Sequence, residues 1–285
     1  MSGYAMTSPG ARTQLAAVIG DPVRHSLSPR LHNAAYGALA MDWVYLAFEV
    51  AAGDVAAAVA GARALGVRGL SVTTPHKEAA LAAADRASPL AERLGAANTL
   101  VIDKGEVVAE STDGDGLVAD LRAAGYEPAG KVAAVIGAGG AARAAIAALG
   151  AAGAREVLVV NRSADNAARA AELAGSVGRA APPEAVADAA VVLQATPVGL
   201  GGRGEGNELL GAVAVHLGAG QLVYDFVYHP PVTSFLAAAA GAGAAVRNGL
   251  GMLVHQAALQ FELFCGEAAP LSVMWAAVAA EAGGA

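Results

Sequence analysis

Three small residues after an apolar run have the spacing of a phosphate cradle. Gly137, Gly139 and Ala142 follow the apolar segment 132–136 as G-x-G-x-x-A and lead into an alanine-rich stretch. The first glycine permits a tight turn, the second lets a pyrophosphate approach the backbone, and the small third residue lets helix and strand pack closely. Free N–H groups at the helix start then stabilise the phosphates. The spacing predicts a dinucleotide site; the alternative is a plain βα turn.

A second apolar run, at 156–160, follows at the spacing of a βαβ unit and ends in Asn161, Arg162 and Ser163. NAD enzymes usually carry Asp or Glu here for the ribose 2′-hydroxyl. A guanidinium suits a 2′-phosphate instead, so we expect NADP. The alternative for Arg162 taken alone is an ordinary solvated charge.

Lys77 is a candidate for proton transfer. The chain has only three lysines, Lys77, Lys104 and Lys131, so lysine is not its default cation. Lys77 falls in the first turn of an expected helix, where the helix dipole disfavours a cation. A compact, titratable ammonium can move a proton, which arginine cannot do. The competing interpretation is a solvated surface lysine.

Other polar residues lie at the ends of expected strands. Ser26 and Ser28 are two apart, so both hydroxyls would point the same way in an extended segment, although Ser28 could equally cap the next helix. Asp113 is either a functional carboxylate or a helix cap, and Tyr228 either packs or binds a ligand. We expect Asp115 and Asp120 to be exposed charges.

The elements that position these residues follow from apolar runs and breakers. Alternating strands and helices in both halves indicate an α/β protein. After residue 248 the sequence Asn-Gly-Leu-Gly indicates a hinge, and on the next helix Met252 and Gln256 face one way while Leu259, Leu263 and Phe264 can face the core. The other expected elements are strands at 15–19, 43–50, 69–73, 132–136, 156–160, 191–194 and 222–225, helices at 30–40, 54–65, from Thr74-Pro75, 114–124 and 233–240, and a hairpin turning at 104–105.

Composition narrows the class of protein. The 285 residues are 55% hydrophobic, largely Ala, with a net charge of -7 and no basic cluster, so nucleic acid is not an expected partner. Apolar runs are cut by glycines, and no transmembrane helix or signal peptide is predicted. We expect a disordered tail at 1–13, a buried Cys265 thiol, no metal site and a cytoplasmic location.

Seven motifs together resemble the shikimate dehydrogenase family, in its order and spacing, from about Leu15 to the end of the chain. The resemblance implies a substrate domain at 1–113 and 250–285, completed by C-terminal helices, around an inserted Rossmann-like, doubly wound NADP domain at 114–249. The motifs are His25-Ser26-Leu27-Ser28-Pro29, Ser71-Val72-Thr73-Thr74-Pro75-His76-Lys77-Glu78, Ala97-Asn98-Thr99, Thr112-Asp113-Gly114, Gly137-Ala138-Gly139-Gly140-Ala141, Asn161-Arg162-Ser163 and Gly249-Leu250-Gly251-Met252-Leu253.

The resemblance also implies an activity and a site. The activity is the reversible, NADP-dependent reduction of 3-dehydroshikimate to shikimate, on the route to chorismate and aromatic amino acids, by a monomer or homodimer. Lys77 and Asp113 resemble the catalytic pair. Substrate ligands by position are Ser26, Ser28, Thr73, Lys77, Asn98, Asp113, Tyr228 and Gln256, and the cofactor side comprises Gly137, Ala138, Gly139, Gly140, Ala141, Asn161, Arg162, Ser163, Thr196, Gly249 and Met252.

Three positions depart from the family pattern and leave alternatives open. Ser71 and Ser111 stand where relatives often carry Asn, and these shorter side chains leave room for water or a different ring substituent. Asn166 stands where relatives often carry a second basic residue for the 2′-phosphate, so we expect a modest preference for NADP. The alternatives are a quinate or aminoshikimate dehydrogenase, and a catalytically silent ligand-binding homologue.

Overall fold

The computed structural model describes residues 8–202 and 207–282 and divides the chain into two compact units. Unit 1 contains the chain through Thr112 together with Leu253–Ala280, and unit 2 contains Asp113–Met252. Asp113 and residues 250–252 therefore cluster with unit 2, whereas the sequence placed them with the first domain. The reason is that each begins a helix whose first turn packs on unit 2, as the contacts below show.

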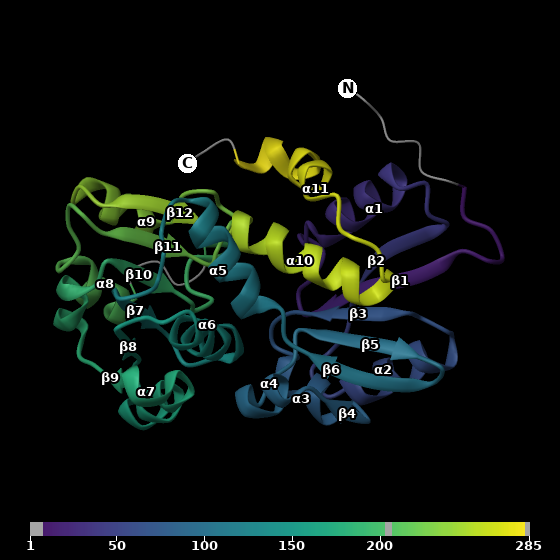
Figure 1. Ribbon diagram of the computed structural model, residues 1–285, viewed down its shortest axis with the longest axis horizontal. Helices are drawn as coiled ribbons and strands as arrows, with labels where there is room; N and C mark the ends of the chain where they lie inside the picture. Colours follow the sequence, from purple (N-terminus) through teal and green to yellow (C-terminus); the bar gives the residue numbers. More distant parts are fainter. Residues whose placement is uncertain (1–7, 203–206, 283–285) are drawn as a thin grey trace. The chain divides into compact units, whose positions relative to one another are not determined.

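Unit 1 is a mixed sheet with helices on its surface (Figure 1). The sheet order is β2-β1-β3-β5-β6-β4, with β1 parallel to β2 and β3, and β5 antiparallel to β3 and β6. The elements are β1 (Gln14–Gly20), α1 (Ser28–Ala38), β2 (Trp43–Glu49), α2 (Val55–Ala64), β3 (Gly69–Val72), α3 (Lys77–Ala82), β4 (Arg86–Ala87), α4 (Pro89–Leu94), β5 (Thr99–Asp103), β6 (Glu106–Glu110) and α11 (Leu271–Val278), with α10 (Leu250–Cys265) from Leu253 onward.

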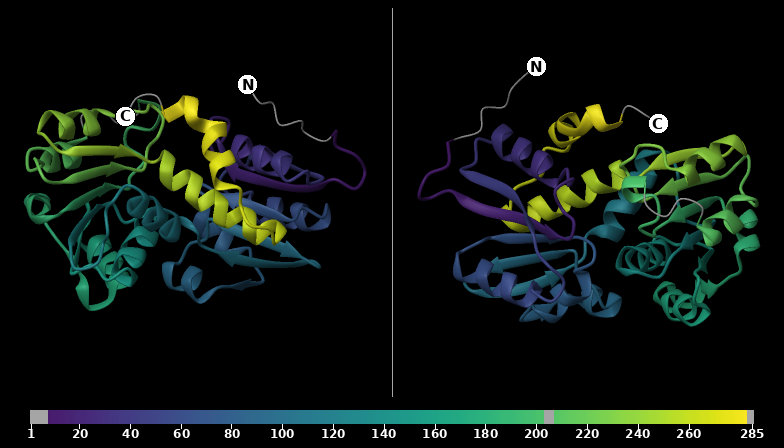
Figure 2. Two further views of the ribbon diagram at one scale, coloured as in Figure 1. Left: turned by 45° about the horizontal axis from the view of Figure 1, so that its top comes forward. Right: turned by 180° about the vertical axis from the view of Figure 1, so that it is seen from behind.

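The C-terminal helices belong to the core of unit 1. A Cβ on Gly69 of β3 would lie 2.1 Å from the Phe264 ring, so only glycine lets α10 approach this strand. Phe261 is fully buried against the rings of His32 and Tyr36. Figure 2 shows α11 beside α1, and the two helices are in contact. Residues 195 to 229 positions apart therefore share one core, as the sequence predicts.

Unit 2 is a parallel sheet in the order β12-β11-β10-β7-β8-β9. The order reverses between β7 and β10, as in doubly wound folds. The predicted α/β class is confirmed. The elements are α5 (Asp113–Ala123), β7 (Val132–Ile136), α6 (Gly140–Ala151), β8 (Glu156–Val160), α7 (Ala164–Ala171), β9 (Gly178–Ala180), β10 (Val191–Gln194), α8 (Glu208–Ala214), β11 (Leu222–Asp225), α9 (Ser234–Gly241), β12 (Ala245–Asn248) and the first turn of α10, with 3₁₀ turns at Glu172–Val177, Pro183–Asp188 and Leu200–Gly202.

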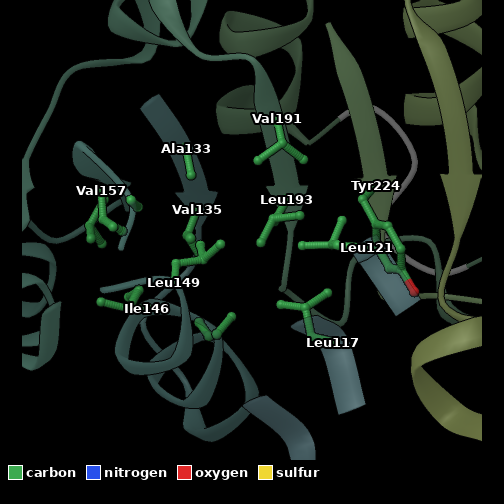
Figure 3. Close-up of a cluster of buried hydrophobic side chains, with 14 of the residues drawn as sticks. Leu117, Leu121, Ala133, Val135, Ile146, Leu149, Val157, Val191, Leu193 and Tyr224 are labelled. Carbon is green, nitrogen blue, oxygen red and sulfur yellow. The ribbon is translucent and has the colours of Figure 1, made fainter. Parts of the chain in front are cut away.

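Both faces of the central strand β7 are buried, which explains why that strand is apolar at every position. Ala133 and Val135 of β7 face one cluster, to which α5 and α6 contribute Leu117, Leu121 and Ile146 (Figure 3). Val132, Ala134 and Ile136 of the same strand face a second cluster on the other side. Burying each large aliphatic side chain stabilises the unit by roughly 1.5 to 3 kcal/mol.

Several local expectations are wrong. Residues 10–13 form a turn tied to Asp42 by a 2.6 Å bond from the Thr13 hydroxyl, so the expected disordered tail does not extend to 13, and residues 1–7 lie outside the described chain. Leu263 is exposed and Leu259 is half-buried, because α10 turns those positions away from the sheet. Cys265 is only half-buried, and its Sγ donates to the Phe261 carbonyl. No described helix is long and apolar enough to cross a membrane.

Candidate functional site

One edge of the unit 1 sheet gathers most of the predicted polar residues. The carboxyl ends of the parallel strands β1, β3 and β6 reach this edge, and the antiparallel strand β5 starts there. Ser71, Thr99 and Glu110 are consecutive partners across these strands. Topology therefore brings four segments together: Ser26 and Ser28 after β1, Thr73 and Lys77 after β3, Asn98 before β5, and Thr112 after β6.

The ends of β1 and β3 are in tight contact. The Thr73 amide donates to the Ile19 carbonyl over 3.0 Å, and a Cβ on Gly20 would lie 2.4 Å from Thr73 Cγ2. Ser28 is the first residue of α1, and its amide donates to Ser26 Oγ over 3.3 Å. The expected extended segment is therefore wrong, and neither serine makes a side-chain cap of α1.

Lys77 is the first residue of α3, as expected for a cation at an unfavourable helix end. The helix does not begin at Thr74-Pro75: these residues form a turn in which the His76 amide donates to Thr73 O over 3.0 Å. Lys77 is half-buried, and its carbonyl accepts from the Ala97 amide over 2.9 Å. This bond fixes the Lys77 backbone beside the residue that precedes Asn98.

Asn98 is the centre of a polar cluster and is only 2% exposed. Its Oδ1 accepts from the Thr112 amide over 2.8 Å, and its Nδ2 donates to Thr112 Oγ1 over 2.9 Å and to Gln256 Oε1 over 3.3 Å. The Gln256 contact joins α10 to the sheet edge across 158 positions of sequence. Asn98 and Gln256, predicted from opposite parts of the chain, thus lie together.

Ser71 does not belong to the open side of this edge. It is 4% exposed, and its hydroxyl is bonded to Tyr45 and Gln260 in the interior. No local pattern indicates these partners, because the three residues lie on β2, β3 and α10. Ser111 is also largely buried, at 9% exposure.

Asp113 follows Thr112 directly and starts α5. It is 6% exposed, whereas Asp115 in the same helical turn is exposed as expected. Gly114 explains how this helix start lies so close to α6, because a Cβ there would be 2.7 Å from the Ala144 carbonyl. Asp113 is therefore held by the packing of unit 2, next in the chain to a residue that bonds Asn98.

In unit 2 the glycine turn lies between β7 and α6, as predicted. Gly137 has a φ of 118°, which disfavours any residue with a Cβ, and its amide donates to Val160 O over 2.9 Å. A Cβ on Gly139 would meet no described atom within 4 Å, so protein packing alone does not require glycine there. Gly140 and Ala141 open α6, whose first N–H groups have no side-chain cap. The turn therefore offers backbone donors beside open space.

The next strand end presents Asn161, Arg162 and Ser163. Ser163 caps α7 by accepting from the Asn166 amide over 3.3 Å, and Asn161 Nδ2 donates to Ser163 O over 3.1 Å. Arg162 is exposed and has no hydrogen bond or ion pair with any described residue. Arg169, one turn along α7, donates to Asn166 Oδ1. A second guanidinium thus lies beside Asn166, whose own side chain is an amide.

Thr196 is held at the end of β10 by a buried amide. Gln194 accepts from the Thr196 amide over 2.6 Å and from its hydroxyl over 2.7 Å, and donates to Asp225 Oδ1 over 3.2 Å. Burial raises the pKa of Asp225 to about 6, against three donors that favour the carboxylate: Thr233, the Val227 amide and Gln194. Tyr228, three residues further on, is half-buried in the following loop.

Residues 248–251, expected as a hinge, are packed onto unit 2. The Leu250 amide donates to Asn248 Oδ1 over 3.1 Å, and a Cβ on Gly249 would lie 2.1 Å from the Phe226 carbonyl. A Cβ on Gly251 would lie 2.0 Å from the Asp120 carboxylate. These glycines therefore serve close packing, and they bring Met252, 7% exposed, to the same edge as the glycine turn.

Asp120 is fully buried, so its expectation as an exposed charge is wrong. Arg247 donates to both of its carboxylate oxygens, over 2.6 and 2.9 Å, and Tyr224 donates over 2.8 Å. The Tyr224 oxygen accepts from the Met252 amide over 3.1 Å, and burial with the nearby carboxylate raises the Tyr224 pKa well above its usual value. The sequence signal for this burial is that Asp120 lies on the same face of α5 as the apolar residues Leu117 and Leu121.

Family comparisons cover both units. Residues 18–100 match the model of the shikimate dehydrogenase substrate binding domain, residues 122–197 that of shikimate / quinate 5-dehydrogenase, and residues 249–279 that of the shikimate 5′-dehydrogenase C-terminal domain. The matches to the first and last models fall largely in unit 1.

Individual relatives cover nearly the whole chain. The shikimate dehydrogenase (NADP(+)) of Moorella thermoacetica is 44% identical over 277 residues, 93% of this chain and 92% of that protein. Shikimate 5-dehydrogenase from Thermus thermophilus, in complex with NADP(H) and shikimate, has a TM-score of 0.85 at 36% identity, over 94% of this chain and 99% of that one. Quinate dehydrogenase from Corynebacterium glutamicum, in complex with NAD, has a TM-score of 0.81 at 28% identity, over 94% and 99%.

Proposed function

The chain belongs to the shikimate dehydrogenase family, and we propose that it catalyses the reversible, NADP-dependent reduction of 3-dehydroshikimate to shikimate. The observation that carries the proposal is the gathering of Lys77, Thr73, Asn98 and Gln256 at one sheet edge, in a chain whose second unit has a dinucleotide turn. The reaction would be one step of aromatic amino-acid synthesis in the cytoplasm, carried out by a monomer or homodimer.

The glycine turn fits a pyrophosphate. Uncapped N–H groups of α6 beside open space at Gly139 can donate to anionic oxygens without displacing protein atoms. Arg162 can form charge-assisted bonds to a 2′-phosphate, and Arg169 adds positive charge beside Asn166. Thr196, Gly249 and Met252, at the ends of β10 and β12, complete the side of the sheet assigned to the cofactor, and the remaining assigned positions are Ala138, Gly140, Ala141, Asn161 and Ser163.

Lys77 and Asp113 carry the proton chemistry. NADPH, when bound, would supply the hydride, and the ketone oxygen of the substrate would then gain negative charge. The Lys77 ammonium stabilises that charge and delivers the proton. Asp113 acts with Lys77 as one unit by stabilising the ammonium and accepting a hydrogen bond from a substrate hydroxyl.

The ring hydroxyls and carboxylate of the substrate need several polar partners. Asn98 offers its amide nitrogen and Gln256 lies beside it, while Ser26, Ser28, Thr73 and Tyr228 supply hydroxyls. Each of these hydroxyls can both donate and accept, which suits a polyhydroxylated ring.

A quinate dehydrogenase is the second candidate, favoured by the likeness to the Corynebacterium enzyme. Ser71 supports a quinate dehydrogenase less than its place in the sequence suggested, because its hydroxyl is bonded in the interior to Tyr45 and Gln260. A silent homologue is disfavoured by the presence of both Lys77 and Asp113.

The discriminating experiment is turnover of the purified protein on shikimate and on quinate, each with NADP⁺ and NAD⁺. We expect the highest kcat/KM for shikimate with NADP⁺. A higher value for quinate supports the second candidate, and ligand binding without any cofactor reduction supports the silent homologue.

A further inference from the structure

We propose that Tyr45, Ser71, Gln260 and Thr99 form a one-way hydrogen-bond relay that positions the side chain of Asn98. The inference rests on the proposed function, because it treats Asn98 as a substrate ligand. It adds four positioning residues to the reaction, none of which was assigned from the sequence.

The relay is continuous from β2 to the start of β5. The Tyr45 hydroxyl donates to Ser71 Oγ over 2.6 Å, and Ser71 Oγ donates to Gln260 Oε1 over 2.6 Å. Gln260 Nε2 donates to Thr99 Oγ1 over 3.0 Å, and Thr99 Oγ1 donates to Asn98 Oδ1 over 2.9 Å. Each link has the length of a full hydrogen bond.

Two backbone groups fix the direction of every link. The Thr112 amide can only donate, and it bonds Asn98 Oδ1 over 2.8 Å, so the oxygen of the Asn98 amide faces Thr112. The Asn98 carbonyl can only accept, and it receives Gln260 Nε2 over 3.1 Å. Gln260 must therefore turn its oxygen towards Ser71, whose single proton is used there, and Ser71 accepts from Tyr45.

The consequence falls on the amide nitrogen of Asn98. With Oδ1 occupied by the Thr112 amide and the Thr99 hydroxyl, Nδ2 is turned towards Thr112 Oγ1 and Gln256 Oε1. The relay thus prevents the Asn98 amide from flipping and keeps one N–H on Thr112 Oγ1 and the other directed at Gln256 at the sheet edge. Ser71 acts here as a relay member, which removes it from the groups that contact the substrate.

Burial makes the relay rigid. Tyr45 and Thr99 are 0% exposed, Gln260 is 1%, Asn98 is 2% and Ser71 is 4%. A polar atom that loses its partner in such an interior cannot be satisfied by bulk water. Removing one hydroxyl therefore weakens the orientation of every member down the relay.

The test compares two buried tyrosines, one whose hydroxyl is hydrogen-bonded and one whose hydroxyl has no partner among the described residues. Tyr45→Phe removes the first donor of the relay. Tyr36→Phe removes a buried hydroxyl that has no hydrogen-bond partner among the described residues and lies in the neighbouring aromatic cluster. We expect Tyr45→Phe to raise KM for shikimate about fivefold to tenfold, the effect of one lost buried hydrogen bond, with KM for NADP⁺ unchanged. Tyr36→Phe should change neither KM.

A second pair tests the end of the relay. Thr99→Ser keeps the hydroxyl and should retain a near-normal KM for shikimate, whereas Thr99→Val should raise it at least as much as Tyr45→Phe. Equal KM values for Tyr45→Phe and Tyr36→Phe, or a parallel rise in KM for both substrates, would overturn the proposal. An inactive wild-type protein would instead refute the proposed function, and the relay's role would fall with it.

Discussion

We expect the ion pair between Arg247 and Asp120 to contribute strongly to the stability of unit 2. Replacing Arg247 with Met keeps the aliphatic stem and removes the guanidinium, so both oxygens of Asp120 lose their bonds to it. The Asp120 side chain is 0% exposed and that of Arg247 is 32% exposed. The variant therefore leaves a fully buried carboxylate with Tyr224 still bonded but without its countercharge.

The magnitude follows from this burial. Removing one partner of a buried pair costs about 3 to 5 kcal/mol, and the lower end applies because Arg247 is one-third exposed and Tyr224 still donates. A loss of about 3 kcal/mol in a unit of this size lowers the melting temperature by roughly 8 to 12 °C.

Differential scanning calorimetry measures the shift, and the same helix α5 provides the control. Arg122 pairs with Glu127 at 3.0 Å, but both side chains are 53% exposed, so Arg122→Met should cost less than about 1 kcal/mol. Equal shifts in melting temperature for Arg247→Met and Arg122→Met would refute the claim that burial makes the Asp120 pair important for stability.

Three further predictions test other parts of the structure. Arg162→Ala should weaken NADP⁺ binding by about 1.5 to 3 kcal/mol and leave NAD⁺ binding nearly unchanged, as measured by titration calorimetry; equal losses would contradict its role at the 2′-phosphate. Gly251→Ala should lower the melting temperature by several degrees through its 2.0 Å approach to Asp120, whereas Gly211→Ala, with open space around it, should not. Burial lowers the pKa of His32 to about 3, so the folded protein keeps this ring neutral while the unfolded chain protonates it below pH 6.5. The contribution of His32 to the free energy of unfolding is therefore fully present above pH 6.5 and falls by about 2 kcal/mol between pH 7 and 5. His32→Phe should therefore lose less melting temperature over that range than the wild type, and an identical loss would contradict the neutral buried ring.

Much of the fold was predictable because strands and turns can be identified from residues that are neighbours in the sequence. The apolar run before Gly137 is buried on both faces of a parallel sheet, so it needs no alternation to be identified. The hairpin at Lys104-Gly105 follows from its turn residues, and both have positive φ. Short elements such as β4 and α4 were not predicted, because two to six residues are too few to show a hydrophobic period.

Buried polar partners could not be predicted, because they join distant parts of the chain. Asp120 meets Arg247 across 127 positions, and Ser71 meets Gln260 across 189. Nothing near Asp120 in sequence distinguishes a buried carboxylate from a solvated one, except its place on the apolar face of α5. Most of the residues assigned to substrate and cofactor, by contrast, lie shortly after or before strands, where the topology collects them.

The most direct test of the account is the turnover of Lys77→Ala on shikimate with NADP⁺. If Lys77 delivers the proton, kcat should fall by about 10² to 10⁴ while KM for shikimate changes much less, because the proton moves in the transition state. Adding Asp113→Ala should make the variant little worse than the poorer single variant, since the two groups act as one unit. A near-normal kcat in Lys77→Ala would contradict the account and leave Lys77 an ordinary surface cation.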